Sequence, residues 1–176
     1  MKLTAYTITA LAFASALAAA SPARADERQV SGTSFITQVE SHFIPEAGDP
    51  TRGFGIEKLV GASTSPGWFD AVQETVTLSS QLDLKAGRAE QKGFVFWRNP
   101  DGTMTLSIVG KATFTMDEKT NAPKGTDEGT IEFNGDTGRF ANVRGHGTFK
   151  TEFSGGNATV HWSGTITGFE KQASTQ

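Results

Sequence analysis

From residue 30 onward, hydrophobic and polar residues alternate in a series of short runs. In residues 72–84 every apolar side chain falls on one register, and residues 103–116 alternate strictly. A period of two residues indicates a strand with one buried face. Similar runs occupy residues 30–44, 53–62, 129–133, 140–153, 158–169 and the segment ending at Trp97. In the run over residues 30–44, one face is expected to carry Phe35, Thr37, Val39, Ser41 and Phe43. In the run over residues 53–62, the apolar face is expected to carry Phe54, Ile56, Lys58 and Val60.

Segments rich in glycine, proline and polar residues separate the runs. In residues 99–102, Pro100 sets φ and Gly102 accepts a positive φ, which is typical of a tight turn. No stretch has the 3.6-residue period of a substantial helix. Short connections favour antiparallel neighbours, and a sheet avoids exposed edges by closing on itself. The sequence predicts an all-β domain, an eight-stranded antiparallel barrel, with an open β-sandwich as the alternative.

Glycine is abundant, and all 20 glycines follow residue 25. Several lie among β-branched and aromatic residues within the predicted strands, where glycine marks bulges, bends or close backbone approach. We therefore expect Gly145 or Gly147 to lie at a bulged or bent position, where a Cβ would collide with the neighbouring strand.

Two charged residues interrupt the apolar faces. Glu74 shares the register of Val76, and Lys58 shares the register of Val60. A carboxyl group inside an apolar barrel would have a raised pKa and could act as an acid or base, so Glu74 is the candidate catalytic group. Alternatively, Glu74 lies at the barrel rim, pairs with Lys58, or is turned outward by a bulge.

Residues 1–25 have the features of a secretory signal peptide. Lys2 precedes an apolar run over residues 8–20, and Ala23-Arg24-Ala25 is a small-x-small cleavage sequence. The run is shorter than the ~20 residues that span a bilayer, which disfavours a membrane anchor. We expect cleavage after Ala25, a mature domain of residues 26–176, a periplasmic or secreted location, and no membrane association after cleavage.

Composition excludes several functions. The chain has no cysteine, and its single tyrosine, Tyr6, lies in the predicted signal, so thiol, disulfide and phenol chemistry are ruled out in the mature protein. Removing Lys2 and Arg24 takes the formal net charge from −3 to −5. A nucleic-acid surface needs clustered basic residues, so nucleic acid is not an expected partner. No phosphate loop or nucleophile elbow is present, and no cofactor is expected.

Two places in the sequence hold residue types that can bind a metal ion. His146 and His161 could lie on paired strands, but third and fourth ligands cannot be named, and His42 is remote in sequence. The acidic residues flanking the loop after Met116 lack calcium-loop spacing, so a solvated loop is the better interpretation than a weak calcium site. These acidic residues are Asp117, Glu118, Asp127 and Glu128. No metal site is predicted.

Three aromatic residues are candidates for ligand contact. Trp68 and Phe69 lie in a predicted loop, and Trp97 ends a strand beside a tight turn. Clustered exposed aromatics at a cavity mouth mark binding sites, although packing as a core plug is the alternative. With Lys58, these residues form the predicted ligand-binding set. The side chains of Arg139 and Arg144 are expected to bond turn carbonyls.

Residues 133–145 (FNGDTGRFANVRG) resemble the G-x-T-G-x-F-x-x-x-R-G turn of the allene oxide cyclase and dirigent barrels. Residues 107–114 (SIVGKATF) resemble the strand that precedes it in that family. The resemblance implies a small eight-stranded barrel with a hydrophobic cavity, often dimeric or trimeric, that binds small apolar molecules and in some branches steers cyclisation or radical coupling. Asp136 replaces the family's usual second glycine, and the mature chain lacks the cavity tyrosine, so the fold is carried over and the activity is not.

Two functions are compatible with these features. The first is a small-hydrophobe-binding or interaction module, because no catalytic constellation is recognisable. The second is an isomerase or cyclase of the allene oxide cyclase type, in which cavity shape directs the reaction and Glu74 is the polar group. The orientation of Glu74 discriminates between them. A homo-oligomer is a further expectation.

Overall fold

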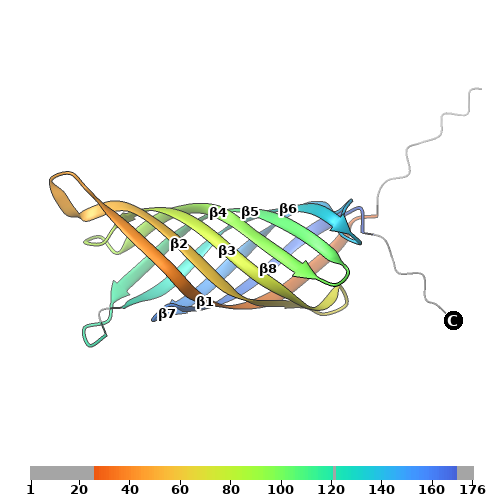
Figure 1. Ribbon diagram of the computed structural model, residues 1–176, viewed down its shortest axis with the longest axis horizontal. Helices are drawn as coiled ribbons and strands as arrows, with labels where there is room; N and C mark the ends of the chain where they lie inside the picture. Colours follow the sequence, from red (N-terminus) through yellow and green to blue (C-terminus); the bar gives the residue numbers. More distant parts are fainter. Residues whose placement is uncertain (1–25, 121, 170–176) are drawn as a thin grey trace, which may run out of the picture.

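The computed structural model describes residues 26–120 and 122–169, so the predicted signal peptide and its cleavage site lie outside the described residues. Most described residues lie in eight strands, and none of them is helical. In chain order the strands are β1 (Arg28–Glu46), β2 (Asp49–Ser65), β3 (Phe69–Asp83), β4 (Arg88–Asn99), β5 (Gly102–Met116), β6 (Pro123–Gly138), β7 (Arg144–Ser154) and β8 (Asn157–Thr167) (Figure 1).

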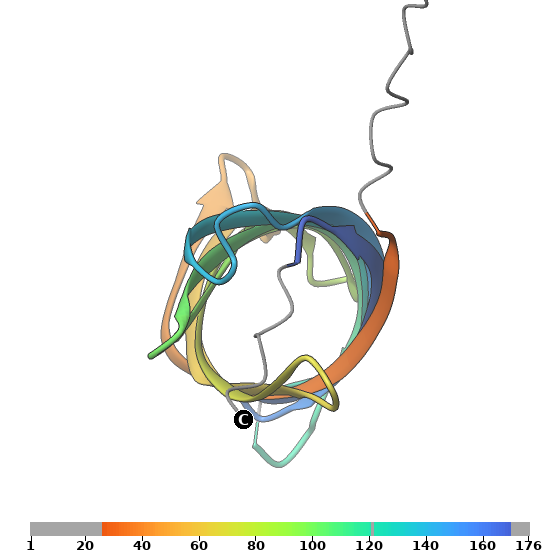
Figure 2. The ribbon, with the colours of Figure 1, turned by 90° about the vertical axis from the view of Figure 1, so that its right-hand side faces the viewer.

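Each strand pairs antiparallel with the next, and β1 also pairs with β8. This last pairing closes the sheet into a barrel, which appears as a ring when viewed along its long axis (Figure 2). The predicted all-β, eight-stranded antiparallel fold is confirmed. Closure leaves no edge strand unpaired in the sheet, which is the physical advantage of a barrel over an open sandwich.

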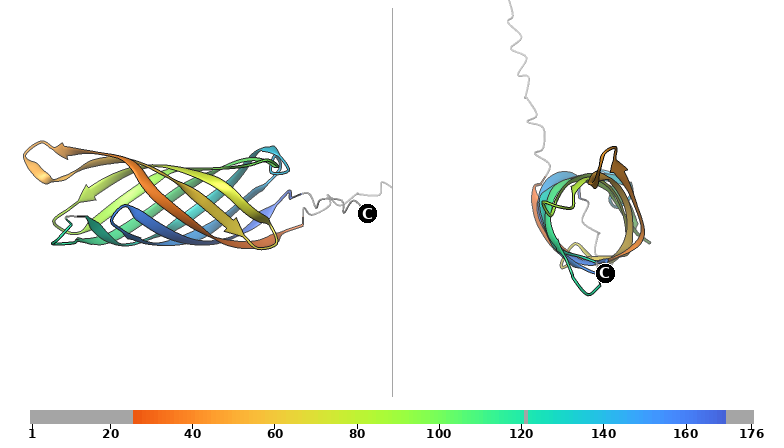
Figure 3. Two further views of the ribbon diagram at one scale, coloured as in Figure 1. Left: turned by 60° about the horizontal axis from the view of Figure 1, so that its bottom comes forward. Right: turned by 90° about the vertical axis from the view of Figure 1, so that its left-hand side faces the viewer.

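The barrel has two different ends. The β1–β2, β3–β4, β5–β6 and β7–β8 connections lie at one end, which we call the loop end, and the β1–β2 hairpin projects farthest there (Figures 1 and 3). The start of β1 and the end of β8 lie at the opposite end, the terminus end, together with the β2–β3, β4–β5 and β6–β7 connections.

The interior is formed by alternate residues, as predicted for β3 and β5. Val72, Val76 and Leu78 are buried on β3, and Met104 and Leu106 are buried on β5. Apolar residues at every second position therefore produced the buried face of these two strands.

The predicted faces of β1 and β2 are wrong. Phe35 and Val39 are 63% and 56% exposed, whereas Ile36 is buried. The register of β1 against β2 shifts between Gln38 and Glu40, so Val39 lies in a β-bulge. Because a bulge adds one residue to a strand, it reverses which alternate residues point inward. Ser41 and Phe43 accordingly line the interior although Phe35 does not.

On β2 the predicted residues do share a face, but it is the outer one. Phe54, Ile56 and Val60 are between 38% and 43% exposed, and Leu59 is buried. Both faces of β2 carry apolar residues, so alternation alone did not identify the inner face.

Glycines allow the strands to approach closely. A Cβ on Gly147 would lie 2.2 Å from the Ser163 carbonyl oxygen, and one on Gly145 would lie 2.2 Å from the Thr165 carbonyl oxygen. Neither position is a bulge, since the pairing of β7 with β6 and β8 is regular. The expected steric collision is therefore confirmed without the bulge.

Candidate functional site

The terminus end of the barrel is filled by a cluster of aromatic rings, which we call the aromatic plug. Its rings lie 5.0–6.5 Å apart between centroids, mostly edge-to-face or tilted, the geometry that aromatic quadrupoles favour. The plug consists of Trp68, Phe69, Trp97, Phe133, Phe140, Trp162 and Phe169. All but Phe169 are buried, so the plug closes this end of the interior.

The turn that carries the family resemblance supplies part of this plug. Phe140 and Val143 from the β6–β7 connection are 1% and 0% exposed. A Cβ on Gly135 would lie 1.5 Å from the Phe140 carbonyl oxygen, so only glycine lets the connection fold back over β6. The Arg144 guanidinium donates to the carbonyls of Gly135 and Val143, as the sequence predicted.

Arg139 contacts the plug and two neighbouring connections at the terminus end. Its guanidinium donates to the Trp68 carbonyl at 2.8 Å and to the Asp101 carboxylate at 2.9 Å, and it lies 4.9 Å from the centroid of the Phe169 ring. Arg139 therefore joins the β2–β3, β4–β5 and β6–β7 connections. The predicted carbonyl contact is confirmed for Trp68.

Between the plug and the loop end lies a cavity of about 390 Å³. Leu84, Met116 and Pro123 line it at the loop end, and Trp97 and Trp162 line it beside the plug. The cavity is thus a cup that is closed at the terminus end and faces the loop end. Most of its lining is apolar, and its volume lies in the range of sites for small organic ligands.

Glu74 points into this cavity. The side chain is 5% exposed, and its Oε2 atom has no hydrogen-bond partner among the described residues. Burial raises the pKa of Glu74, because the charged form loses hydration. The Ser34 hydroxyl and the Trp97 indole N–H oppose this effect, although the indole nitrogen makes no hydrogen bond of good geometry.

Asp127 is a second buried carboxyl group in the cavity wall, so its predicted place beside a solvated loop is wrong: it lies within β6 and is 6% exposed. The Gln91 amide donates to Asp127 Oδ2, whereas Oδ1 has no hydrogen-bond partner among the described residues. A Cβ on Gly110 would lie 2.7 Å from Oδ1, so this glycine makes room for the carboxylate. Burial raises the pKa of Asp127 to about 6, and the Gln91 bond opposes that rise. The available sequence signal was the alternation that places Asp127 in the same register as Ile131 and Phe133, both of which are buried.

Glu57 is the third acidic residue of the lining, and burial raises its pKa as well. The sequence pattern does not reveal it, because Glu57 lies between the positions of Ile56 and Lys58, whose face was predicted to be the inner one and is exposed. Over residues 26–120 and 122–169, the lining contains no lysine, arginine or histidine. Three carboxyl groups therefore share an apolar cavity without a basic side chain.

Of the four residues predicted to bind a ligand, only Trp97 lines the cavity. Lys58 is exposed on the outer face of β2, opposite Thr77 of β3, so it neither lines the cavity nor pairs with Glu74. Trp68 and Phe69 are buried in the plug and do not form an exposed mouth, because their rings pack against the aromatic residues of β4, β6 and β8.

The residues that could have bound a metal ion do not come together in the fold. His161 lies opposite Lys150 and His146 opposite Thr165, so the two histidines are not cross-strand partners. Asp127 points inward while its neighbour Glu128 is exposed, which separates the acidic residues around the β5–β6 loop. In residues 26–120 and 122–169, no three potential ligands converge on a point that could hold a metal ion.

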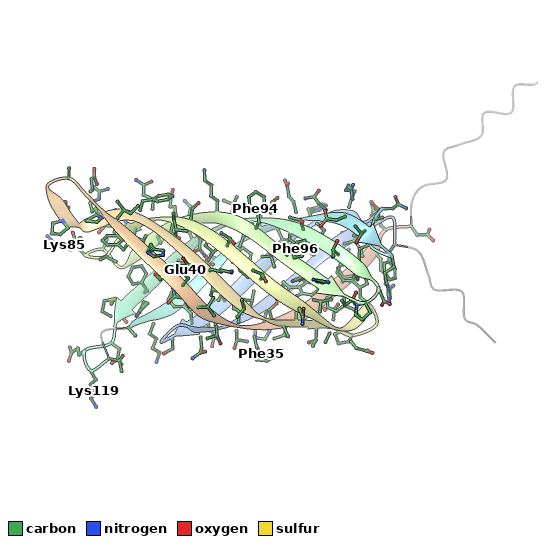
Figure 4. All side chains as sticks on the ribbon, viewed as in Figure 1. Phe35, Glu40, Lys85, Phe94, Phe96 and Lys119 are labelled. Carbon is green, nitrogen blue, oxygen red and sulfur yellow. The ribbon has the colours of Figure 1, made fainter. Side chains whose placement is uncertain are left out.

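Several large apolar side chains are exposed on the outer surface of the barrel. Phe94 and Phe96 on β4 are 60% and 42% exposed, and Phe35 on β1 is also exposed, as the side-chain view shows (Figure 4). Exposed apolar residues of this size mark contact surfaces when they form a continuous patch.

Comparison with family models, curated proteins and solved structures finds no match for this chain. Within the part of the chain that the structure describes, no helix is long and apolar enough to cross a membrane.

Proposed function

We propose that this protein binds a small hydrophobic molecule inside its barrel. The observation that supports the proposal is the cup-shaped cavity of about 390 Å³, which is closed by the aromatic plug and lined mostly by apolar side chains. A barrel needed only as a scaffold could fill its interior completely, as the plug does at the terminus end. Pockets with apolar walls and a few polar groups are typical of binding sites for small organic molecules.

A cavity-filling variant tests binding directly. Ala112 is buried in the wall, whereas Ala62 is exposed on the outer face of β2. We expect Ala112→Phe to abolish the binding of decanol and Ala62→Phe to leave decanol binding unchanged. Binding is monitored by the change in tryptophan fluorescence. Mass spectrometry of the purified wild-type protein should also detect a copurifying apolar compound. Absence of both decanol binding and a copurifying compound would contradict the proposal.

A second candidate function is an isomerase or cyclase reaction in the same cavity. The specific observation that favours it is the inward, buried position of Glu74, which has one unpaired carboxyl oxygen and a raised pKa. Such a group can hold or release a proton beside an apolar substrate. In D2O, the wild-type protein should incorporate deuterium into the copurified ligand, and Glu74→Gln should not. Tight binding without deuterium incorporation would favour the binding function.

We also propose that the protein is exported and shares ancestry with the allene oxide cyclase and dirigent barrels. The signal-like residues 1–25 and the turn over residues 133–145 support these proposals. Mass spectrometry of the protein from a periplasmic or culture fraction should give a chain beginning at Asp26. Self-association, which the same resemblance implies, remains a prediction that sedimentation velocity would test.

A further inference from the structure

The charge inside the cavity has one sign. Among the residues that the structure describes, the titratable side chains of its lining are Glu57, Glu74 and Asp127, and none of the lining residues is basic. Carboxyl groups in an apolar interior are normally neutralised by protonation or by a basic partner. Lys58, the nearest candidate from the sequence, is on the outer face. The described residues therefore supply no counter-charge in the cavity.

Two of these groups have an unused acceptor atom. Glu74 Oε2 and Asp127 Oδ1 are buried and unpaired among the described residues, and the side chains are only 5% and 6% exposed. A buried acceptor without a donor is costly, so an occupant that donates hydrogen bonds would be favoured at both places.

The three groups also lie at different depths. Asp127 is four residues from the loop-end start of β6, whereas Glu74 is five residues from the terminus-end start of β3. Glu57 lies halfway along β2. Asp127 is thus the acidic group nearest to the mouth, and the wall between it and the plug is lined by apolar residues such as Leu106 and Ile131.

From this geometry we propose that the ligand is an organic cation, a protonated amine on an apolar body, whose ammonium group binds Asp127 while its apolar part extends toward Trp97 and Trp162. This inference rests on the proposed binding function and specifies its ligand class. Gln91 holds Asp127 Oδ2, which leaves Oδ1 to accept from the ammonium.

The pH dependence of Asp127 makes the proposal testable. Its pKa of about 6 leaves it ionised at pH 7.5 and largely protonated at pH 5. Glu57 and Glu74 are the other titratable groups of the lining, and Glu128, on the outer face, also repels the Asp127 charge. The ammonium group of an alkylamine stays charged over this pH range. Any change in the affinity of the amine must therefore come from titration of a group of the protein.

The experiment compares decylamine, decanol and decanoate, which share one chain and differ in the head group, by titration calorimetry. At pH 7.5 the amine should bind at least about tenfold more tightly than the alcohol, as expected for a hydrogen bond to a charged group, and decanoate should bind most weakly. Both pH 5 and Asp127→Asn should remove the preference of the protein for the amine over the alcohol. Glu132→Gln, an exposed acidic position on the same strand, should retain it.

The outcomes separate the inference from the proposed function. Equal or tighter binding of decanol or decanoate by the wild-type protein would overturn the cation inference and leave hydrophobic binding intact. A preference for the amine that persists at pH 5 and in Asp127→Asn would overturn the assignment to Asp127. If none of the three probes binds, the proposed function itself fails. The pH arm uses the wild-type protein, so the test does not depend on folding of the variant.

Discussion

Asp127 should make the folded protein less stable as the pH rises. Burial raises the pKa of Asp127 from 3.8 to about 6, so between these two values the folded state retains a proton that the unfolded chain has lost. The free energy of unfolding therefore falls as the pH rises through this window and levels off above it. At ~1.36 kcal/mol per pKa unit, full ionisation of Asp127 costs about 3 kcal/mol.

Replacing Asp127 with asparagine removes the buried charge and preserves the side-chain size. The Asn amide oxygen can still accept from Gln91, and the pKa of about 6 already includes the stabilisation that this bond gives to the wild-type carboxylate. At pH 8 we expect the variant to be more stable than wild type by about 3 kcal/mol, the full cost of ionising the buried wild-type carboxyl. For a chain of this size that corresponds to an increase in Tm of roughly 6–12 °C.

The assay is urea unfolding, followed by tryptophan fluorescence, at intervals from pH 3 to pH 8. The advantage of Asp127→Asn should appear between pH 4 and pH 7 and vanish at pH 3, where the wild-type carboxyl is neutral. Glu132→Gln, with an exposed side chain on the same strand, should give no such pH-dependent difference. If Asp127→Asn differs from wild type by the same amount at every pH, the carboxyl is hydrated and the cavity argument is wrong.

Three further perturbations test other parts of the structure. Because burial raises the pKa of Glu74, the free energy of unfolding of the wild type falls as the pH rises above the pKa of Glu74 in the unfolded chain. Glu74→Gln should therefore be more stable than wild type at alkaline pH. Urea unfolding in which the variant follows wild type at every pH would show that the carboxyl is exposed. Gly147→Val should lower the free energy of unfolding by about 1–3 kcal/mol, because its Cβ would lie 2.2 Å from a backbone oxygen; an unchanged Tm would mean that β7 and β8 can separate locally. Arg144→Ala removes donors to turn carbonyls and should cost about 1–3 kcal/mol in thermal unfolding, with Lys119→Ala, on an exposed loop, as the neutral control.

The strand order and the inner faces of β3 and β5 were predictable because they depend on local pattern. Val76 and Leu78 on β3, and Leu106 on β5, alternate with polar or small residues, and burying that apolar face requires an extended chain. Short turns such as Asn99–Gly102 then determine antiparallel pairing. The inward position of Glu74 followed from the same alternation.

Sequence pattern was enough to predict antiparallel strands, to favour a barrel over an open sandwich, and to place Glu74 in the register of the apolar residues of β3. The pairing of β1 with β8, which closes the barrel, is a property of the folded chain. Only the tertiary structure decided which face of β2 is inside and where the bulge at Val39 reverses β1, because both strands carry apolar residues on both faces. It also brought Gln91 of β4 to Asp127 of β6 across the gap that Gly110 leaves. That contact depends on strand tilt and on the absence of one side chain, which are properties of the closed barrel and not of any single strand.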